Sequence, residues 1–384
     1  MTKPLDLAAL PFDADAMLEG LRPWVECESP TWDAAAVNRM MDLASHSLAL
    51  MGARTERISG RMGFADCLRA TVPHATPAVP GILVLGHLDT VHPVGALARL
   101  PFRRDRAHAW GPGICDMKGG IYLALEAIRV LARAGHATPL PVTLLLTGDE
   151  EAGSPASRAL IEAEAARHRY VLVPEPALPD GGVVTGRCAI ARFSLEAIGV
   201  EATGRPHAGV RLAEGRSAIR EMARKILDIE VMSTEACSFS VGVVHGGQSV
   251  NCVPANCTAE VLGMARRQED MDRGAARLLA LSASGSDVGF AVTKGVTRPA
   301  WEPSAGTMAL YEVARGVARS LGCELSQQQA GGGSDGNFTG ALGIPTLDGL
   351  GVHGAGGHTL DEHILVDSLA QRARLMAGLL AALA

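Results

Sequence analysis

Histidine and acidic side chains stand at the ends of apolar runs in the first half of this 384-residue chain. His87 and Asp89 follow one run, the acids at 149–151 follow a second, and Glu175 follows a third, between two prolines. Asp116 lies in the glycine-rich segment GPGICDMKGG, just before a helical pattern. Taken singly, each has an ordinary interpretation as a helix N-cap, a solvated helix start or a structural histidine. Their shared place at the ends of elements favours a common site.

The elements that position these residues alternate between apolar strands and helices. This alternation is typical of a mostly parallel sheet covered on both faces, and such sheets bind ligands beyond the carboxyl ends of their strands. Carboxylates crowded at that edge repel one another unless a cation holds them. The motif GGHTLDEH near the C-terminus adds His358. Because histidine and carboxylate ligands suit Zn²⁺, and a shared carboxylate can bridge two ions about 3.5–4 Å apart, we expect this edge to bind metal.

The predicted elements fall into three stretches. Up to residue 173 they are strands at 65–72, 81–85, 142–147 and 170–173 and helices at 33–51, 119–134 and 155–165. From 191 to 294 they are strand 191–199, helix 215–230, strands 238–245 and 257–266, helix 269–284 and strand 287–294. From 304 onward they are helix 304–320, strands 323–327 and 344–347 and helix 366–383. This order predicts an α/β domain formed by 1–189 and 300–384, interrupted by an inserted ferredoxin-like α+β domain (β-α-β-β-α-β) at 190–299.

Composition and charge argue against several classes of protein. Lys and Arg total 35 and Asp and Glu total 41, so the net charge is −6 with interspersed signs, which disfavours a nucleic-acid surface or a polybasic membrane contact. The sequence contains no run of 18 apolar residues, the length needed to span a membrane. Acidic residues near the N-terminus lie where a signal peptide would need an apolar run. The eight cysteines include no Cys-x-x-Cys pair, unlike a zinc ribbon or a disulfide framework. We therefore expect a cytoplasmic protein without nucleic-acid or membrane partners.

The motifs occur in an order that resembles a known family. GHLDT, GPGICDMKGG, TGDEEAGS, VPEP, GGGSDG and GGHTLDEH are similar to motifs of the dizinc aminoacylases, acetylornithine deacetylases, succinyl-diaminopimelate desuccinylases and glutamate carboxypeptidases. TGDEEAGS and GGGSD bring the chain nearest to the carboxypeptidase G-type branch. The resemblance covers roughly residues 80 to 365. It implies a dizinc exopeptidase-like catalytic domain and identifies the inserted domain as a lid through which two chains form a homodimer.

The resemblance also implies a set of metal ligands. His87 and Glu175 would hold one zinc ion, Glu151 and His358 would hold the other, and Asp116 would bridge the two. Co²⁺ and Mn²⁺ are expected to substitute for zinc.

Two further acids receive catalytic roles from the same resemblance. Asp89 would orient the imidazole of His87 by accepting a hydrogen bond from the ring N–H that does not face the metal. Glu150 would be the general base, taking a proton from a water that bridges the metals as it attacks an amide carbonyl.

The inserted domain is expected to contribute substrate contacts. The segment GRPHAG implies that His207 reaches the active site of a partner subunit and stabilises an oxyanion, although the preceding loop is one residue shorter than usual. Asn251 begins the lid turn NCVP. The family's usual arginine position is occupied by Met264, and Arg266 lies two residues further along the predicted strand. Whether Arg266 takes over that role stays open, as does the alternative of a solvated strand end.

A second group of residues is predicted to bind a substrate carboxylate. Arg298 resembles by position a clamping arginine, whose planar guanidinium suits a carboxylate. Gly332 and Gly333 could offer backbone N–H groups to the same carboxylate, and Arg187 is assigned to the pocket lining. The alternative interpretation of Arg298 is a surface residue at a hinge.

The leading hypothesis is a zinc-dependent carboxypeptidase or deacylase that cleaves the amide bond of an N-acyl amino acid or a small peptide. An alternative enzyme is an amidohydrolase of the same fold acting on N-carbamoyl or other C–N bonds. A non-catalytic metal-binding dimerisation protein would predict loss of the base or of a ligand, whereas all six positions are filled. A nucleotide-binding protein would need a phosphate-binding fingerprint, which the sequence lacks. The acyl group and the preferred amino-acid side chain stay open.

Overall fold

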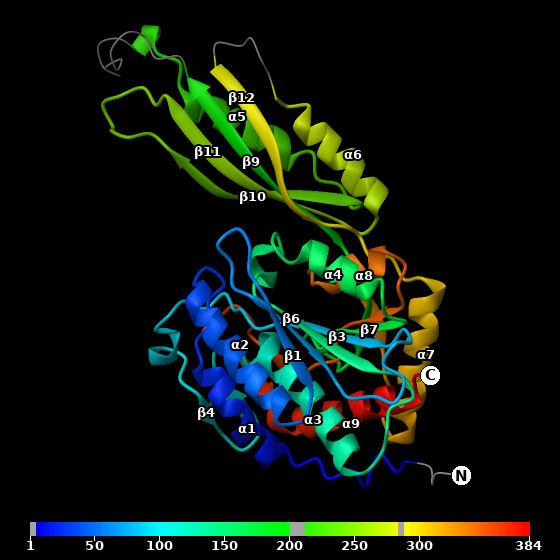
Figure 1. Ribbon diagram of the computed structural model, residues 1–384. Helices are drawn as coiled ribbons and strands as arrows, with labels where there is room; N and C mark the ends of the chain where they lie inside the picture. Colours follow the sequence, from blue (N-terminus) through cyan, green and yellow to red (C-terminus); the bar gives the residue numbers. More distant parts are fainter. Residues whose placement is uncertain (1–4, 200–211, 283–287) are drawn as a thin grey trace. The chain divides into compact units, whose positions relative to one another are not determined.

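The computed structural model describes residues 5–199, 212–282 and 288–384, and the chain divides into two compact units (Figure 1). The large unit comprises Met1–Gly186, Pro303–Ala330 and Ser334–Ala384, and the small unit comprises Arg187–Glu302 and Gly331–Gly333. The segment predicted as an insertion, 190–299, lies within the small unit. The glycines at 331–333 also group with the small unit, although they follow it in sequence.

A six-stranded sheet forms the centre of the large unit. Its strand order is β1 (Arg54–Ile58), β2 (Cys67–Thr71), β6 (Val142–Thr147), β3 (Ile82–His87), β7 (Tyr170–Leu172) and β14 (Thr346–Leu347). β6, β3, β7 and β14 run parallel, whereas β2 pairs antiparallel with both β1 and β6. The predicted α/β class with a mostly parallel sheet is therefore confirmed. The edge strand β1 was not predicted, because its sequence RTERI carries three charged residues.

Helices cover both faces of this sheet (Figure 1). They are α1 (Ala14–Glu26), α2 (Ala34–Ala49), α3 (Gly119–Arg133), α4 (Arg158–Ala165), α7 (Ala305–Ser320), α8 (Gly336–Ala341) and α9 (Val366–Ala382). Ile82 and Val84 of β3 pack in the core shared with α1, α2, α3 and α9, whereas Leu83 and Leu85 pack on the opposite face in the core of α4 and α8. All four side chains are fully buried, which explains why β3 is an uninterrupted apolar run.

Two smaller sheets complete the large unit. One has the order β15 (Gly354–Ala355), β16 (His363–Leu365), β5 (His108–Trp110) and β4 (Arg103–Arg104), and the other pairs β13 (Gln327–Ala330) with β8 (Val183–Arg187). The prediction of a strand at 323–327 was wrong, since β13 begins only at Gln327. Leu325 is buried, and its carbonyl accepts a hydrogen bond of 2.7 Å from the hydroxyl of Tyr311 in α7. Its apolar character therefore reflects packing of a loop against a helix.

The small unit is built on an antiparallel sheet of its own. The strand order is β10 (Cys237–Gly246), β11 (Asn256–Ala265), β9 (Ala189–Gly199) and β12 (Val288–Arg298), with helices α5 (Ala218–Glu230) and α6 (Gln268–Leu279). Phe193, Leu195 and Ala197 of β9 are buried in a separate hydrophobic core, while the residues between them are exposed. The chain order β9-α5-β10-β11-α6-β12 is the predicted β-α-β-β-α-β unit.

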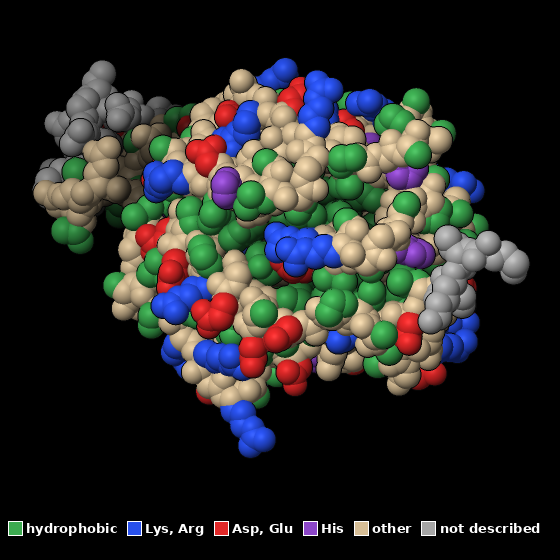
Figure 2. All heavy atoms as spheres, turned by 60° about the horizontal axis from the view of Figure 1, so that its bottom comes forward, with side chains coloured by type: hydrophobic (Ala, Val, Ile, Leu, Met, Phe, Trp, Pro, Cys, Tyr) green, Lys and Arg blue, Asp and Glu red, His purple; other side chains and the backbone are tan. Residues whose placement is uncertain are grey.

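The surface shows no grouping of charge by sign on the face presented in Figure 2, where basic and acidic side chains are intermixed among the residues drawn in colour. Within the described ranges, no helix has both the length and the apolar character needed to cross a membrane.

Candidate metal centre

The register of the central sheet brings the predicted site residues to one edge. β3 and β6 run parallel with His87 opposite Thr147, so the segments that follow them, with Asp89 and Glu150, leave the sheet side by side. β7 lies on the other side of β3 and ends three residues before Glu175. The carboxyl ends of the three strands thus deliver their polar residues to the same place.

Asp116 lies between two pairs of side chains. Its Oδ1 lies 3.2 Å from Nε2 of His87, and its Oδ2 lies 3.3 Å from Nε2 of His358. Nε2 of His87 also lies 3.6 Å from Oε1 of Glu175, and Nε2 of His358 lies 3.1 Å from Oε2 of Glu151. Each oxygen of one carboxylate therefore faces a different histidine–glutamate pair.

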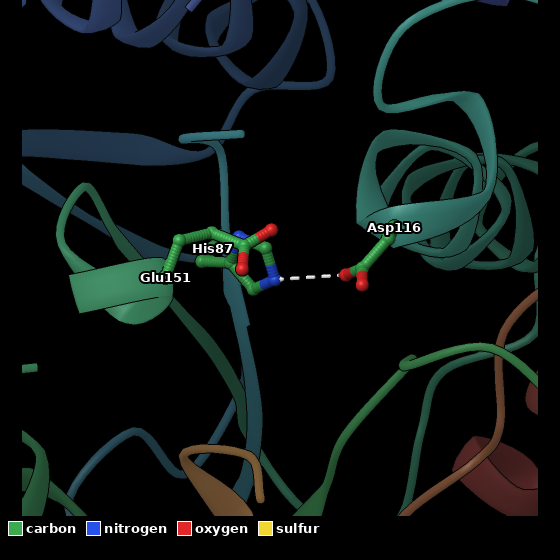
Figure 3. A group of neighbouring side chains, drawn as sticks. All are labelled: His87, Asp116 and Glu151. Atoms are coloured by element: carbon green, nitrogen blue, oxygen red, sulfur yellow. Dashed lines mark hydrogen bonds and ion pairs between the residues drawn. The ribbon is translucent and has the colours of Figure 1, made fainter. Parts of the chain in front are cut away.

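The cluster is compact enough to surround a cation. Figure 3 shows Asp116, which precedes α3, pointing toward the ring of His87, with Glu151 projecting from the short 3-10 helix η3 (Glu150–Ala152). One ligand atom from each of these three residues lies within 4.8 Å of the others. Oε1 of Glu151 is buried and has no hydrogen-bond partner among the described residues. A buried carboxylate oxygen without a donor is costly, so this donor set fits a metal ion.

The electrostatics of the cluster show how much these acids depend on positive charge. Burial raises the pKa of Glu175 well above its ordinary value, and the carboxylate of Asp116 raises it further. Hydrogen bonds to Asp116 and Glu151 raise the pKa of His358 to about 10. Burial alone lowers the pKa of His87, but hydrogen bonds to the surrounding carboxylates raise it well above its ordinary value. A divalent cation would supply the charge that protonated imidazoles otherwise provide.

Comparison with known proteins identifies the family. The model for peptidase family M20/M25/M40 matches residues 83–382. The chain belongs to this M20 family. Carboxypeptidase G2 of Pseudomonas sp. (strain RS-16) is 31% identical over 308 residues, which cover 78% of this chain and 73% of that protein. Succinyl-diaminopimelate desuccinylase of Paracoccus denitrificans is 29% identical, covering 76% and 80%.

Solved structures share the fold of this M20 protein. Aminopeptidase PepT of Bacillus cereus aligns with a TM-score of 0.76 at 24% identity, covering 96% of this chain and 98% of that chain. The M20 metallo-carboxypeptidase Sso-CP2 of Sulfolobus solfataricus aligns with a TM-score of 0.76 at 16% identity, covering 95% and 98%. The family resemblance inferred from the motifs is confirmed, and the M20 protein is an enzyme of the metallopeptidase and amidohydrolase class.

Asp89 was predicted to contact His87, and in the M20 site it also contacts the segment that carries Glu150 and Glu151. Its backbone carbonyl oxygen lies 3.0 Å from Nδ1 of His87. Its carboxylate accepts hydrogen bonds from the backbone N–H of Glu150 at 3.3 Å, the N–H of Glu151 at 3.2 Å and the hydroxyl of Thr31 at 2.8 Å. Asp89 therefore fixes the turn that carries both glutamates. The sequence offered no signal for Thr31, which lies 58 residues away.

Four of the predicted substrate-binding residues lie together in the small unit of the M20 enzyme. Arg187 and Arg298 are both buried, and Nη1 of Arg187 donates a hydrogen bond of 3.1 Å to the carbonyl of Gly332. A Cβ atom at Gly333 would lie 2.7 Å from Cδ of Arg298, so the backbone of the glycine loop lies directly against this arginine side chain. The structure thus groups two guanidinium groups with the glycine loop.

The other predicted lid residues of the M20 enzyme have different surroundings. Asn251 is exposed between β10 and β11, where its Oδ1 accepts a hydrogen bond of 2.5 Å from Ser249. Met264 is half-buried near the end of β11, and Arg266 is exposed just beyond that strand. His207 lies outside the described residues.

Proposed function

We propose that this M20 enzyme holds two zinc ions and hydrolyses the amide bond of an N-acyl amino acid or a small peptide, releasing an amino acid. The observation that carries the proposal is the division of the Asp116 carboxylate between His87 and His358, at 3.2 Å and 3.3 Å. A carboxylate placed in this way can be shared by two cations, whereas a single ion would need only one of the two histidine–glutamate pairs.

The proposed ligands follow from these pairs. His87 and Glu175 would hold one ion, His358 and Glu151 would hold the other, and Asp116 would contribute one oxygen to each. Zinc, when bound, polarises a carbonyl oxygen and lowers the pKa of water. Co²⁺ or Mn²⁺ is proposed to substitute, because histidine and carboxylate ligands also suit these ions.

Glu150 is proposed as the general base. It is the first residue of η3, it is 8% exposed, and Asp89 holds its backbone N–H. Burial and the charge of Asp116 are the larger causes of the raised pKa of Glu175, and the charge of Glu150 also raises it. This contribution supports a position of Glu150 close to the proposed ligands. A carboxylate there can take a proton from the attacking water and deliver it to the leaving amine.

The small unit is proposed to bind the carboxylate of the released amino acid. The buried pair Arg187 and Arg298, next to Gly332 and Gly333, supports this role because guanidinium groups pair well with carboxylates. Asn251 and Arg266 are proposed as further substrate contacts. His207 is proposed to stabilise an oxyanion in the active site of a partner subunit.

A homodimer formed through the small unit and a cytoplasmic location complete the proposal. All eight cysteines are free, which supports a reducing compartment. Light scattering tests the dimer: a fully active monomer would remove the role of His207 toward a partner.

The test of the function is amine release from a panel of N-acetyl, N-succinyl and N-aroyl amino acids, dipeptides and N-carbamoyl amino acids, each assayed with and without a chelator. We expect hydrolysis of at least one N-acyl amino acid or dipeptide, lost on chelation and restored by Zn²⁺. Turnover of the N-carbamoyl compounds alone would assign the amidohydrolase alternative. Metal binding without turnover of any compound would leave a metal-binding protein, and metal-independent turnover would overturn the proposal.

A further inference from the structure

Glu362 lies where two segments of the large unit meet. It immediately precedes β16, which pairs antiparallel with β5 so that His363 lies opposite Trp110. This register places Glu362 beside the start of the glycine-rich loop that leads to Asp116, and the backbone N–H of Gly111 donates to the carbonyl of Glu362 at 3.3 Å. Within the motif GGHTLDEH, the sequence predicted a role for His358 and none for Glu362.

The side chain of Glu362 is 1% exposed and accepts four hydrogen bonds. Its Oε1 accepts from the backbone N–H groups of Cys115 at 2.8 Å and Asp116 at 3.0 Å. Its Oε2 accepts from the backbone N–H of Gly113 at 2.9 Å and lies 2.6 Å from Nε2 of His92, which is 6% exposed. Since two carboxylate oxygens offer about four acceptor sites, Glu362 is saturated by these donors and is not a further metal ligand.

We propose that Glu362, held in place by His92, is a positioning residue that sets the orientation of the bridging carboxylate of Asp116. The inference rests on the metal site of the proposed function. The two oxygens of Asp116 face His87 and His358, so a small rotation of the Asp116 backbone would displace the carboxylate from both histidines at once. Glu362 binds the N–H of Asp116 itself and those of Cys115 and Gly113 just before it, and thereby fixes the loop up to the ligand.

The position of Glu362 also links two sets of ligands. It follows His358 by four residues, so the same segment supplies a ligand and the group that holds Asp116. Outer partners of metal ligands orient them, and their loss typically lowers metal affinity about 10–100-fold. Glutamine keeps the size of the side chain, but its NH₂ group would face backbone N–H donors and lose their hydrogen bonds.

The test compares Glu362→Gln with Glu164→Gln in the full chain. Glu164 in α4 is also buried, at 3% exposed, and pairs at 2.8 Å with Arg69, away from the metal ligands. For each apo protein, Zn²⁺ affinity is measured by competition with a chromogenic chelator, the absorption spectrum is recorded after loading with Co²⁺, and thermal unfolding is followed without metal. We expect Glu362→Gln to lower Zn²⁺ affinity about 10–100-fold and to alter the Co²⁺ spectrum, while Glu164→Gln matches the wild type in both.

The outcomes separate this inference from the proposed function. If the wild type binds two ions and Glu362→Gln shows the same affinity and spectrum, Glu362 has only a structural role and the inference fails alone. If the wild type binds no divalent ion tightly, both fail. Should Glu362→Gln not fold, His92→Phe, which keeps a ring at this position but removes one donor to Glu362, takes its place. A smaller loss of affinity at unchanged apo stability would support the inference, and unchanged affinity would overturn it.

Discussion

Asp116 shows how one side chain can organise a whole site. Its two oxygens face different histidines, and each histidine has its own second carboxylate, Glu175 beside His87 and Glu151 beside His358. The family resemblance implied both these five residues and their pairing, and the folded chain adds the distances at which the two pairs face the carboxylate of Asp116. Removing a member of one pair should therefore affect one metal position more than the other.

Replacement of His358 by alanine tests this pairing. We expect bound zinc to fall from two ions per chain to one, because His87, Glu175 and Asp116 still form one site. Atomic emission on the dialysed protein measures the stoichiometry. His46→Ala in α2, which removes an exposed histidine, should keep both ions. Two ions bound by His358→Ala would contradict the assignment.

Glu150 should affect turnover and not metal content. Glu150→Gln keeps the shape of the side chain but cannot take up a proton at neutral pH, so we expect kcat to fall roughly 10²–10⁴-fold with both metals retained. The measurement is the hydrolysis rate on the best substrate together with metal analysis. Glu19→Gln on the exposed side of α1 is the control. A Glu150→Gln enzyme with a near wild-type rate would disprove the base assignment.

At the scale of elements, the start of α3 connects two ligand segments. A Cβ atom at Gly120, in the first turn, would lie 1.8 Å from the carbonyl oxygen of Pro174, the residue before Glu175. Only glycine allows the helix that follows Asp116 to approach the backbone of the Glu175 loop so closely. Gly120 in the motif MKGG is thus required for this packing.

Gly120→Ala should destabilise the protein by about 1–3 kcal/mol, because either the helix or the Pro174 loop must move. Urea unfolding of the apo protein measures the free energy of unfolding, and zinc affinity is expected to fall with it. Gly316→Ala in α7 is a matched control: no atom lies within 4 Å of its Cβ position, so alanine should raise stability by about 0.5–1 kcal/mol. Equal stability of Gly120→Ala and wild type would refute the packing argument.

The strands β1 and β13 were not predicted, because their sequences, RTERI and QQQA, lack the apolar pattern that predicts a strand. Backbone pairing with a neighbouring strand determines both, and that pairing is not visible in local sequence. The strands β3, β6 and β7 were predicted because their burial on both faces requires continuous apolar residues.

At the scale of the whole molecule, the two units have separate hydrophobic cores. Phe193 and Phe239 pack in the core of the small unit, with ring centroids 6.3 Å apart, whereas every proposed metal ligand lies in the large unit. Metal binding should therefore stabilise the large unit directly and leave the small unit largely unchanged.

Calorimetry with and without a chelator tests this separation. A metal present at 100 times its Kd adds about 2.7 kcal/mol to the stability of the unit that binds it, so chelation should lower the melting temperature of one transition only. Phe239→Ala, which costs about 3–5 kcal/mol in the other core, should lower the second transition and leave the chelator-sensitive one in place. One transition that responds to both changes would show that the units unfold together.

The sequence by itself determined the class of the sheet, the positions of its central strands and the identity of the proposed ligands, because burial patterns and motifs are local properties of the chain. Asp89 was predicted to orient His87, but tertiary structure alone decided that Thr31 and Glu362 contact the segments that carry the ligands. Thr31 reaches Asp89 across 58 residues, and Glu362 reaches the backbone of Asp116 across 246. Both contacts depend on how separate segments pair, β16 with β5 in the second case. Hydrogen bonds between distant segments leave no periodic signal, since their geometry exists only once the strands that carry them have paired.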